Sequence, residues 1–75
     1  MSEQDLDQLR LAYKEAIDEW IDAIRAEEAL ATPDHSMLAM EEWDAAHLKE
    51  HDAHTRTTEA REAYTDALRR LNYGI

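Results

Sequence analysis

Residues 31–36 read ATPDHS, and this short stretch decides the fold predicted for the chain. It holds the one proline of the sequence, Pro33, while the one glycine, Gly74, lies beside the C-terminal residue. Elsewhere the strong helix formers Ala, Leu, Glu, Arg, Lys and Gln predominate. Because helix breakers are so few, the sequence predicts two long helices joined by one turn.

The predicted elements form a single domain over residues 1–75. We expect a helix over about 4–31, a turn over about 32–35 and a second helix over about 36–72. Thr32, Asp34 and Ser36 compete to cap the second helix, and Gly74 suits its C-terminal end. A turn this short makes the two helices antiparallel neighbours. The expected fold class is therefore all-α, a two-helix antiparallel hairpin.

Each predicted helix carries an apolar stripe whose residues are three and four positions apart. In the first helix the stripe comprises Leu6, Leu9, Tyr13, Ala16, Ile17, Trp20, Ala23, Ile24 and Leu30. In the second helix it comprises Ala39, Met40, Trp43, Ala46, Ala53, Ala60, Tyr64, Ala67, Leu68 and Leu71. The leucines outside these stripes, which are candidates for contact with another protein, are Leu11 and Leu48.

The composition leaves little volume for a self-sufficient core. Of the 75 residues 44% are apolar, but many of these are alanine, and phenylalanine and cysteine are absent. Chains this small usually need a disulfide, a metal ion or oligomerisation to become stable. Since cysteine is absent, disulfides and thiolate metal sites are excluded. Oligomerisation, or a metal site built from histidine and carboxylate, remains.

The charge is strongly acidic, with 18 Asp and Glu against 8 Lys and Arg and a net charge of -10. Phosphate backbones and anionic membranes repel such a surface, so we expect no direct nucleic-acid binding and no membrane binding. A basic protein surface is a plausible partner, and the chain could act as an acidic mimic on a surface that otherwise binds nucleic acid. Neither a signal-peptide pattern nor a membrane-length apolar run occurs, so the expected location is cytoplasmic.

The two predicted helices differ in length, and this predicts a dimer. A symmetric turn places residues whose numbers sum to about 66 opposite each other, so that Trp20 faces His47 and Tyr13 faces His54. The second helix then overhangs the first by about ten residues, or about 15 Å, with Tyr64, Leu68, Leu71 and Tyr73 uncovered. A second copy, related by a two-fold axis near residue 54, would cover this overhang and complete a four-helix bundle.

In the predicted homodimer, Met40 and Trp43 of one chain meet Leu68 and Tyr64 of the other. The architecture resembles that of the ROP-type bundle, a dimer of hairpins, at the level of two helices and a turn. The RNA-binding role of that family is not carried over, because its basic face has no counterpart in this sequence. The predicted interface residues are Met40, Trp43, His47, Glu50, His54, Thr57, Arg61, Tyr64, Leu68 and Leu71.

Polar residues interrupt the stripe of the second helix at residues 46–54, AHLKEHDAH. Such a break is where function or the specification of register is to be sought. One interpretation is a polar layer at the dimer centre, in which Glu50 approaches Thr57 of the partner subunit and His54 faces its own symmetry mate. A layer of this kind sets register and oligomeric state at a cost in stability.

The alternative interpretation is a metal-binding bundle. His47 and His51 are four residues apart, as are Glu50 and His54, and this spacing lets two side chains reach one ion. Glu27 belongs to the stripe of the first helix, but it is expected to lie near the turn and well away from these groups. The candidate ligands for a divalent transition metal are therefore His47, Glu50, His51 and His54.

A third interpretation is a pH switch, in which protonated His54 side chains repel each other across the two-fold axis. Catalysis finds little support, because the serines fall in predicted helix caps and a hairpin offers little concave volume for a substrate. We therefore expect a small acidic protein without catalytic activity or cofactor. Its expected role is that of a homodimeric protein–protein interaction or regulatory module.

Overall fold

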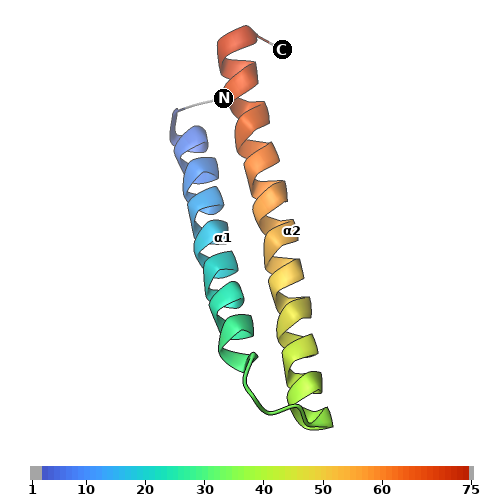
Figure 1. The fold of residues 1–75 in the computed structure, drawn as a ribbon. Coiled ribbons are helices and arrows are strands. Elements are labelled where there is room, and N and C mark those ends of the chain that lie inside the picture. Colours follow the sequence, from blue (N-terminus) through green and yellow to red (C-terminus); the bar gives the residue numbers. More distant parts are fainter. Residues whose placement is uncertain (1–2, 75) are drawn as a thin grey trace.

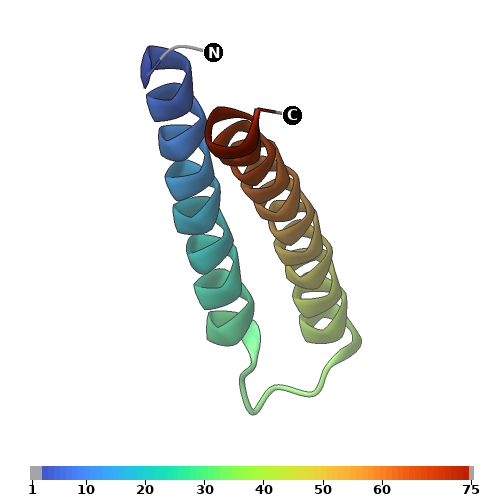
Figure 2. The ribbon, with the colours of Figure 1, turned by 90° about the horizontal axis from the view of Figure 1, so that it is seen from above.

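Two antiparallel α-helices make up the described part of the chain, which is the backbone of residues 3–74 with the side chains of residues 5–74 in a computed structural model. Helix α1 spans Glu3–Leu30 and helix α2 spans Met37–Tyr73. The helices lie side by side, and their free ends point the same way (Figures 1 and 2). No strand occurs among the described residues, so the fold is an all-α hairpin.

The hairpin is long and thin, with extents of 56 × 17 × 12 Å. The 37 residues of α2 span about 55 Å at 1.5 Å per residue, so this one helix sets the length of the molecule. With only two helices, each has a single neighbour to pack on. The remaining faces of both helices are surface.

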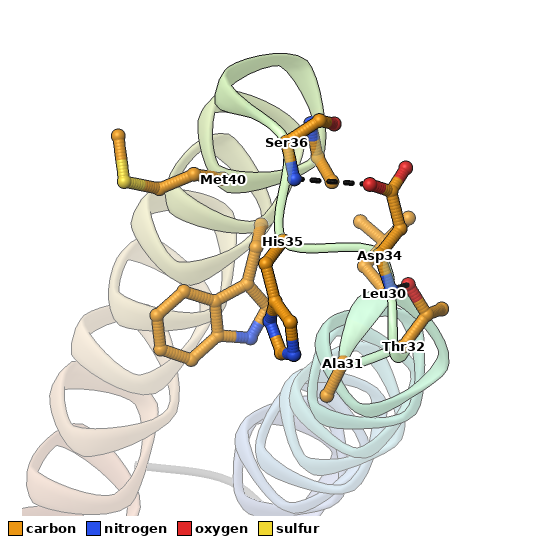
Figure 3. A pocket seen from close by; sticks show the side chains of 9 residues that line it. Leu30, Ala31, Thr32, Asp34, His35, Ser36 and Met40 are labelled. Atoms are coloured by element: carbon orange, nitrogen blue, oxygen red, sulfur yellow. Dashed lines mark hydrogen bonds between the residues drawn. The ribbon is translucent and has the colours of Figure 1, made fainter.

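Side-chain hydrogen bonds hold the ATPDHS connection, and one of them caps the start of α2. Thr32 Oγ1 accepts a hydrogen bond from the backbone N–H of Asp34 (3.3 Å), and Asp34 Oδ1 accepts one from the N–H of Ser36 (2.9 Å; Figure 3). Ser36 is the N-cap of α2, and its hydroxyl accepts from the N–H of Ala39 at 3.2 Å. Gly74 closes the other end at φ 71°, in the left-handed region that glycine adopts without strain. The contacts of Ser36 and Gly74 satisfy backbone groups that the two ends of α2 leave open.

The helices face each other along residues that recur every seven positions, as in a coiled coil. We call these rows the seam. In α1 the seam comprises Leu6, Leu9, Tyr13, Ala16, Trp20, Ala23, Glu27 and Leu30, most of them half-buried. In α2 it comprises Ala39, Trp43, Ala46, Glu50, Ala53, Thr57, Ala60, Tyr64, Ala67 and Leu71. Every second seam position of α2 is thus alanine.

Alanine dominates the buried part of the seam. The buried apolar residues are Ala16, Ala46, Ala53 and Ala67, and no large side chain of the described residues is fully buried. Small side chains allow the two helices to approach closely, but each removes little apolar area from water. Since the stabilisation from burial scales with that area, the seam alone contributes much less than a core of leucine and isoleucine would.

The register of the two helices differs from the expected one. Trp20, expected opposite His47, contacts Glu50 and His54 instead. Tyr13, expected opposite His54, packs against Tyr64 with ring centroids 6.5 Å apart. The expected register is wrong because the connection does not turn symmetrically: it lines a common hollow with residues 39, 40 and 43, so α2 begins beyond the end of α1 (Figure 1).

The predicted C-terminal overhang is shorter than expected for the same reason: Tyr64 and Leu68 are half-buried, whereas Leu71 and Tyr73 are 56% and 74% exposed. Leu6, near the start of α1, lines a hollow together with Tyr64, Leu68 and Leu71, so these residues have neighbours in their own chain. Exposed apolar side chains also occur at the opposite end of α2, in its first turns. They include Met37 and Leu38, which are 68% and 65% exposed.

Neither helix combines the length and the apolar character needed to cross a membrane, as far as the described residues extend.

Candidate functional site

The polar residues of the 46–54 stretch contact α1 of the same chain. Trp20 donates a hydrogen bond from Nε1 to Oε1 of Glu50 at 2.6 Å. The ring of His54 lies against the indole of Trp20, with centroids 4.6 Å apart and planes at 36°. The seam holds Glu50 half-buried, and a carboxylate in such a place needs a hydrogen-bond donor. Trp20 supplies that donor from within the chain.

Thr57 connects the two backbones at the middle of the seam. Its Oγ1 lies 3.0 Å from the carbonyl oxygen of Ala16 in α1 and 2.9 Å from that of Ala53 in α2. The hydroxyl donates to these carbonyls, and the residue is only 6% exposed. A threonine at an apolar seam position is therefore explained by a contact inside one chain, which fixes the register between the helices.

Glu27, in the last turn of α1, also contacts the polar residues of α2. Its Oε1 lies 3.2 Å from Nδ1 of His47, and the Glu27 side chain is 20% exposed. Glu27, His47 and Glu50 each place one potential ligand atom within 4.8 Å of the others. The expectation that Glu27 lies well away from these groups is wrong, because the shifted register brings the end of α1 alongside His47.

The structure places only some of the candidate metal ligands predicted from the sequence close to one another. It brings His47 and Glu50 together and adds Glu27. It directs His54 to the ring of Trp20, and it leaves His51 exposed on the surface of α2. A signal for Glu27 was present in the sequence, since it continues the seven-residue row of Leu6, Tyr13 and Trp20. The row gave the face of the helix but not its register.

The residues predicted at the dimer interface fall into three groups in the structure. Glu50, Thr57 and Tyr64 lie in the seam and contact α1. Trp43 and Leu71 belong to the seam but are exposed near the ends of α2. The remaining predicted residues lie along one edge of the seam, and they are Met40, His47, His54, Arg61 and Leu68.

Two contacts show which edges of the helices share a side of the hairpin. Arg56 Nε and Glu19 Oε2 are 3.8 Å apart, so these residues lie on one side. Arg10 and Leu68 line a common hollow, and they lie on the other. Residues seven apart along a coiled-coil helix share an edge. The residues that repeat at this spacing from Arg10 and Leu68 are Ile17, Ile24, Arg61, His54, His47 and Met40.

We call the side that carries Arg10 and Leu68 the isoleucine side. Ile21 follows Ile17 by one helical turn and belongs to the same side, and Ile21 and Ile24 are 39% and 40% exposed. Its charges balance, because acidic and basic residues are equal in number. The acidic residues are Asp7, Glu28 and Asp44, and the basic residues are Arg10, Lys14 and Arg61.

We call the opposite side, which carries Glu19 and Arg56, the acidic side. Carboxylates outnumber cations on it, so much of the net charge of the chain lies there. Its acidic residues are Asp5, Glu15, Glu19, Asp22, Glu42, Asp52, Glu59 and Asp66, and its basic residues are Lys49, Arg56 and Arg70. A shallow groove between the helices on this side is lined mainly by alanine and leucine, with Glu42 and Lys49 among the lining residues.

A scan against protein-family models and searches of curated proteins and solved structures found no significant match.

Proposed function

We propose that the protein is a non-catalytic, homodimeric interaction module of the cytoplasm that binds other proteins. One observation carries this proposal: the seam buries alanine, while large apolar side chains remain on the surface. A hairpin with so little buried apolar area is marginally stable on its own. The seam buries too little apolar area for high stability. Burying the exposed isoleucine and methionine side chains against a second copy would add stability, since each fully buried side chain contributes roughly 1.5–3 kcal/mol.

The proposed surface for the second copy is the isoleucine side. Two chains with a net charge of -10 each repel one another, and the repulsion is smallest where charges balance. The isoleucine side meets this condition and also carries the exposed apolar row. The acidic side does not, because its carboxylates would face those of the second copy.

The proposed dimer is isologous, with a two-fold axis close to Ile21. A two-fold axis pairs the same patch from both chains, and Ile21 lies between Ile17 and Ile24 in the apolar row. The two hairpins then form a four-helix bundle, and residues 40, 47, 54, 61 and 68 of α2 lie at its interface. Glu50, Thr57 and Tyr64 keep their contacts within each hairpin.

The acidic side would remain free in this dimer and is the proposed surface for a basic protein partner. Its excess of carboxylates supports this role, since complementary charge accelerates association and favours a basic partner over an acidic one. The groove on this side is lined by small apolar residues with a rim of Glu42 and Lys49. That lining suits contact with another protein better than it suits chemistry on a small substrate, which supports a role without catalysis.

The solution mass of two matched variants tests the proposal. Ile21 and Leu11 are both exposed apolar residues of α1, at 39% and 47%, but Leu11 lies outside the seam and outside the isoleucine side. We expect the natural protein and Leu11→Glu to sediment at twice the chain mass of 8.7 kDa, and Ile21→Glu to sediment at or near the chain mass. A natural protein that stays monomeric at micromolar concentration contradicts the proposal, as does equal dimerisation of the two variants.

A further inference from the structure

We propose that Glu27, His47 and Glu50 bind one divalent transition-metal ion, with zinc as the probe, between the end of α1 and the first half of α2. All three ligands come from one hairpin, although His47 lies on the isoleucine side that the proposed dimer would cover. The three side chains come from two helices and place their ligand atoms within 4.8 Å of one another. One imidazole and two carboxylates form a donor set that suits zinc and its neighbours among the transition metals.

The separation of Glu27 and His47 fits a shared ion. Nδ1 of His47 and Oε1 of Glu27 are 3.2 Å apart. Two ligand atoms that each lie about 2.0–2.1 Å from a tetrahedral zinc ion are about 3.3 Å from each other. An ion could therefore replace this direct contact with little change in the distance between the two atoms, once both side chains turn toward the ion.

Glu50 is held in place by a residue outside the ligand set. Trp20 donates to Oε1 of Glu50 at 2.6 Å, which leaves Oε2 of the same carboxylate available to an ion. Hydrogen bonds of this kind orient the ligands in metal sites and tune their affinity. Trp20 would thus be a positioning residue, while Glu27, His47 and Glu50 would be the ligands.

The surroundings also favour a cation. Glu27 and Glu50 are half-buried carboxylates close to each other, and they belong to a chain with a net charge of -10. Like charges at such a distance repel, and a divalent ion between them removes the repulsion. In the single hairpin the His47 side chain is 60% exposed, so there solvent can reach the site and supply a fourth ligand. The ion would join α1 to α2 where the seam buries only Ala46.

Calorimetric titration of zinc into metal-stripped protein tests the site, with cobalt as a spectroscopic probe of the same ligands. We expect one ion per chain and a rise in melting temperature with zinc, because binding to the folded state alone stabilises it. Glu27→Gln and His47→Ala should each weaken zinc binding by more than about tenfold. The matched controls Glu28→Gln and His51→Ala change neighbouring groups outside the set, and we expect them to bind as the natural protein does.

Trp20→Phe separates positioning from ligation. We expect it to weaken zinc binding about tenfold, the usual effect of losing an outer hydrogen bond, while the visible spectrum of bound cobalt keeps its shape. Circular dichroism of each variant shows whether the helices persist. Zinc binding should persist in Ile21→Glu, which separates this site from the dimer. The inference is overturned by an absence of saturable zinc binding, by equal losses in Glu27→Gln and Glu28→Gln, or by a dependence on His51 instead of Glu27.

Discussion

The isoleucine side and the acidic side are built from the same two helices, yet they offer a neighbouring molecule different surfaces. The isoleucine side combines half-exposed Ile21 and Ile24 with balanced charges, whereas the acidic side combines an alanine-lined groove with an excess of carboxylates. Two copies of one acidic chain can approach through the first side at little electrostatic cost. The second side would attract a basic molecule, as proposed. The two proposed interactions thus use different sides of one thin hairpin.

The difference between the two sides depends on the seam that separates them. The seam fixes which edge of α1 lies beside which edge of α2, and its register is held by the contacts of Trp20 and Thr57. Alanines at alternate positions of α2 let the helices approach closely enough for these contacts. A change in the seam should therefore disturb both sides, while a change on one side should leave the other unaffected.

The largest expected effect comes from enlarging a seam alanine. Ala53 is 2% exposed, so Ala53→Leu must push the helices apart, and overpacking of this kind costs typically 1–3 kcal/mol. Ala45→Leu places the same side chain on an exposed position of α2 and should change the free energy of unfolding by less than about 0.5 kcal/mol. Urea unfolding of both variants measures the difference. Equal stability of the two variants would contradict the assignment of the seam.

A smaller effect is expected from Trp20→Phe. The substitution removes the N–H that donates to Glu50 and leaves a half-buried carboxylate without this donor. The expected loss is about 1 kcal/mol in the free energy of unfolding, measured in metal-free buffer. Trp43 is 42% exposed, and Trp43→Phe should have a smaller effect. If Trp43→Phe lowers the free energy of unfolding more than Trp20→Phe does, the hydrogen bond from Trp20 to Glu50 does not hold the register.

The smallest expected effect is that of salt on the dimer. Each chain has a net charge of -10, so screening should reduce the long-range repulsion between two copies and tighten the dimer modestly. Binding of a basic peptide to the acidic side should weaken over the same range of salt, because there the charges attract. Sedimentation for the dimer and fluorescence anisotropy for the peptide measure the two trends. A dimer that dissociates as salt increases would mean that attractive ion pairs hold it together.

The sequence predicted the two helices and the apolar stripes because helix formers and their spacing are local properties. Gly74 and Ser36 end and begin α2 as expected from their capping chemistry. The register was not predictable, because it depends on how residues 31–36 run along the first turns of α2. Without the register, the prediction made the C-terminal overhang too long and separated Glu27 from His47. It also assigned Glu50 and Thr57 to a neighbouring chain, although the structure satisfies them within their own.

Cross-linking through a single introduced cysteine tests most directly whether the isoleucine side is the dimer interface. The chain has no cysteine, so a short thiol cross-linker can join only the introduced residues. Ile21→Cys should give a product of twice 8.7 kDa at micromolar concentration, and Leu11→Cys should give little under the same conditions. Equal cross-linking at both positions, or none at Ile21→Cys, would contradict a dimer formed through the isoleucine side.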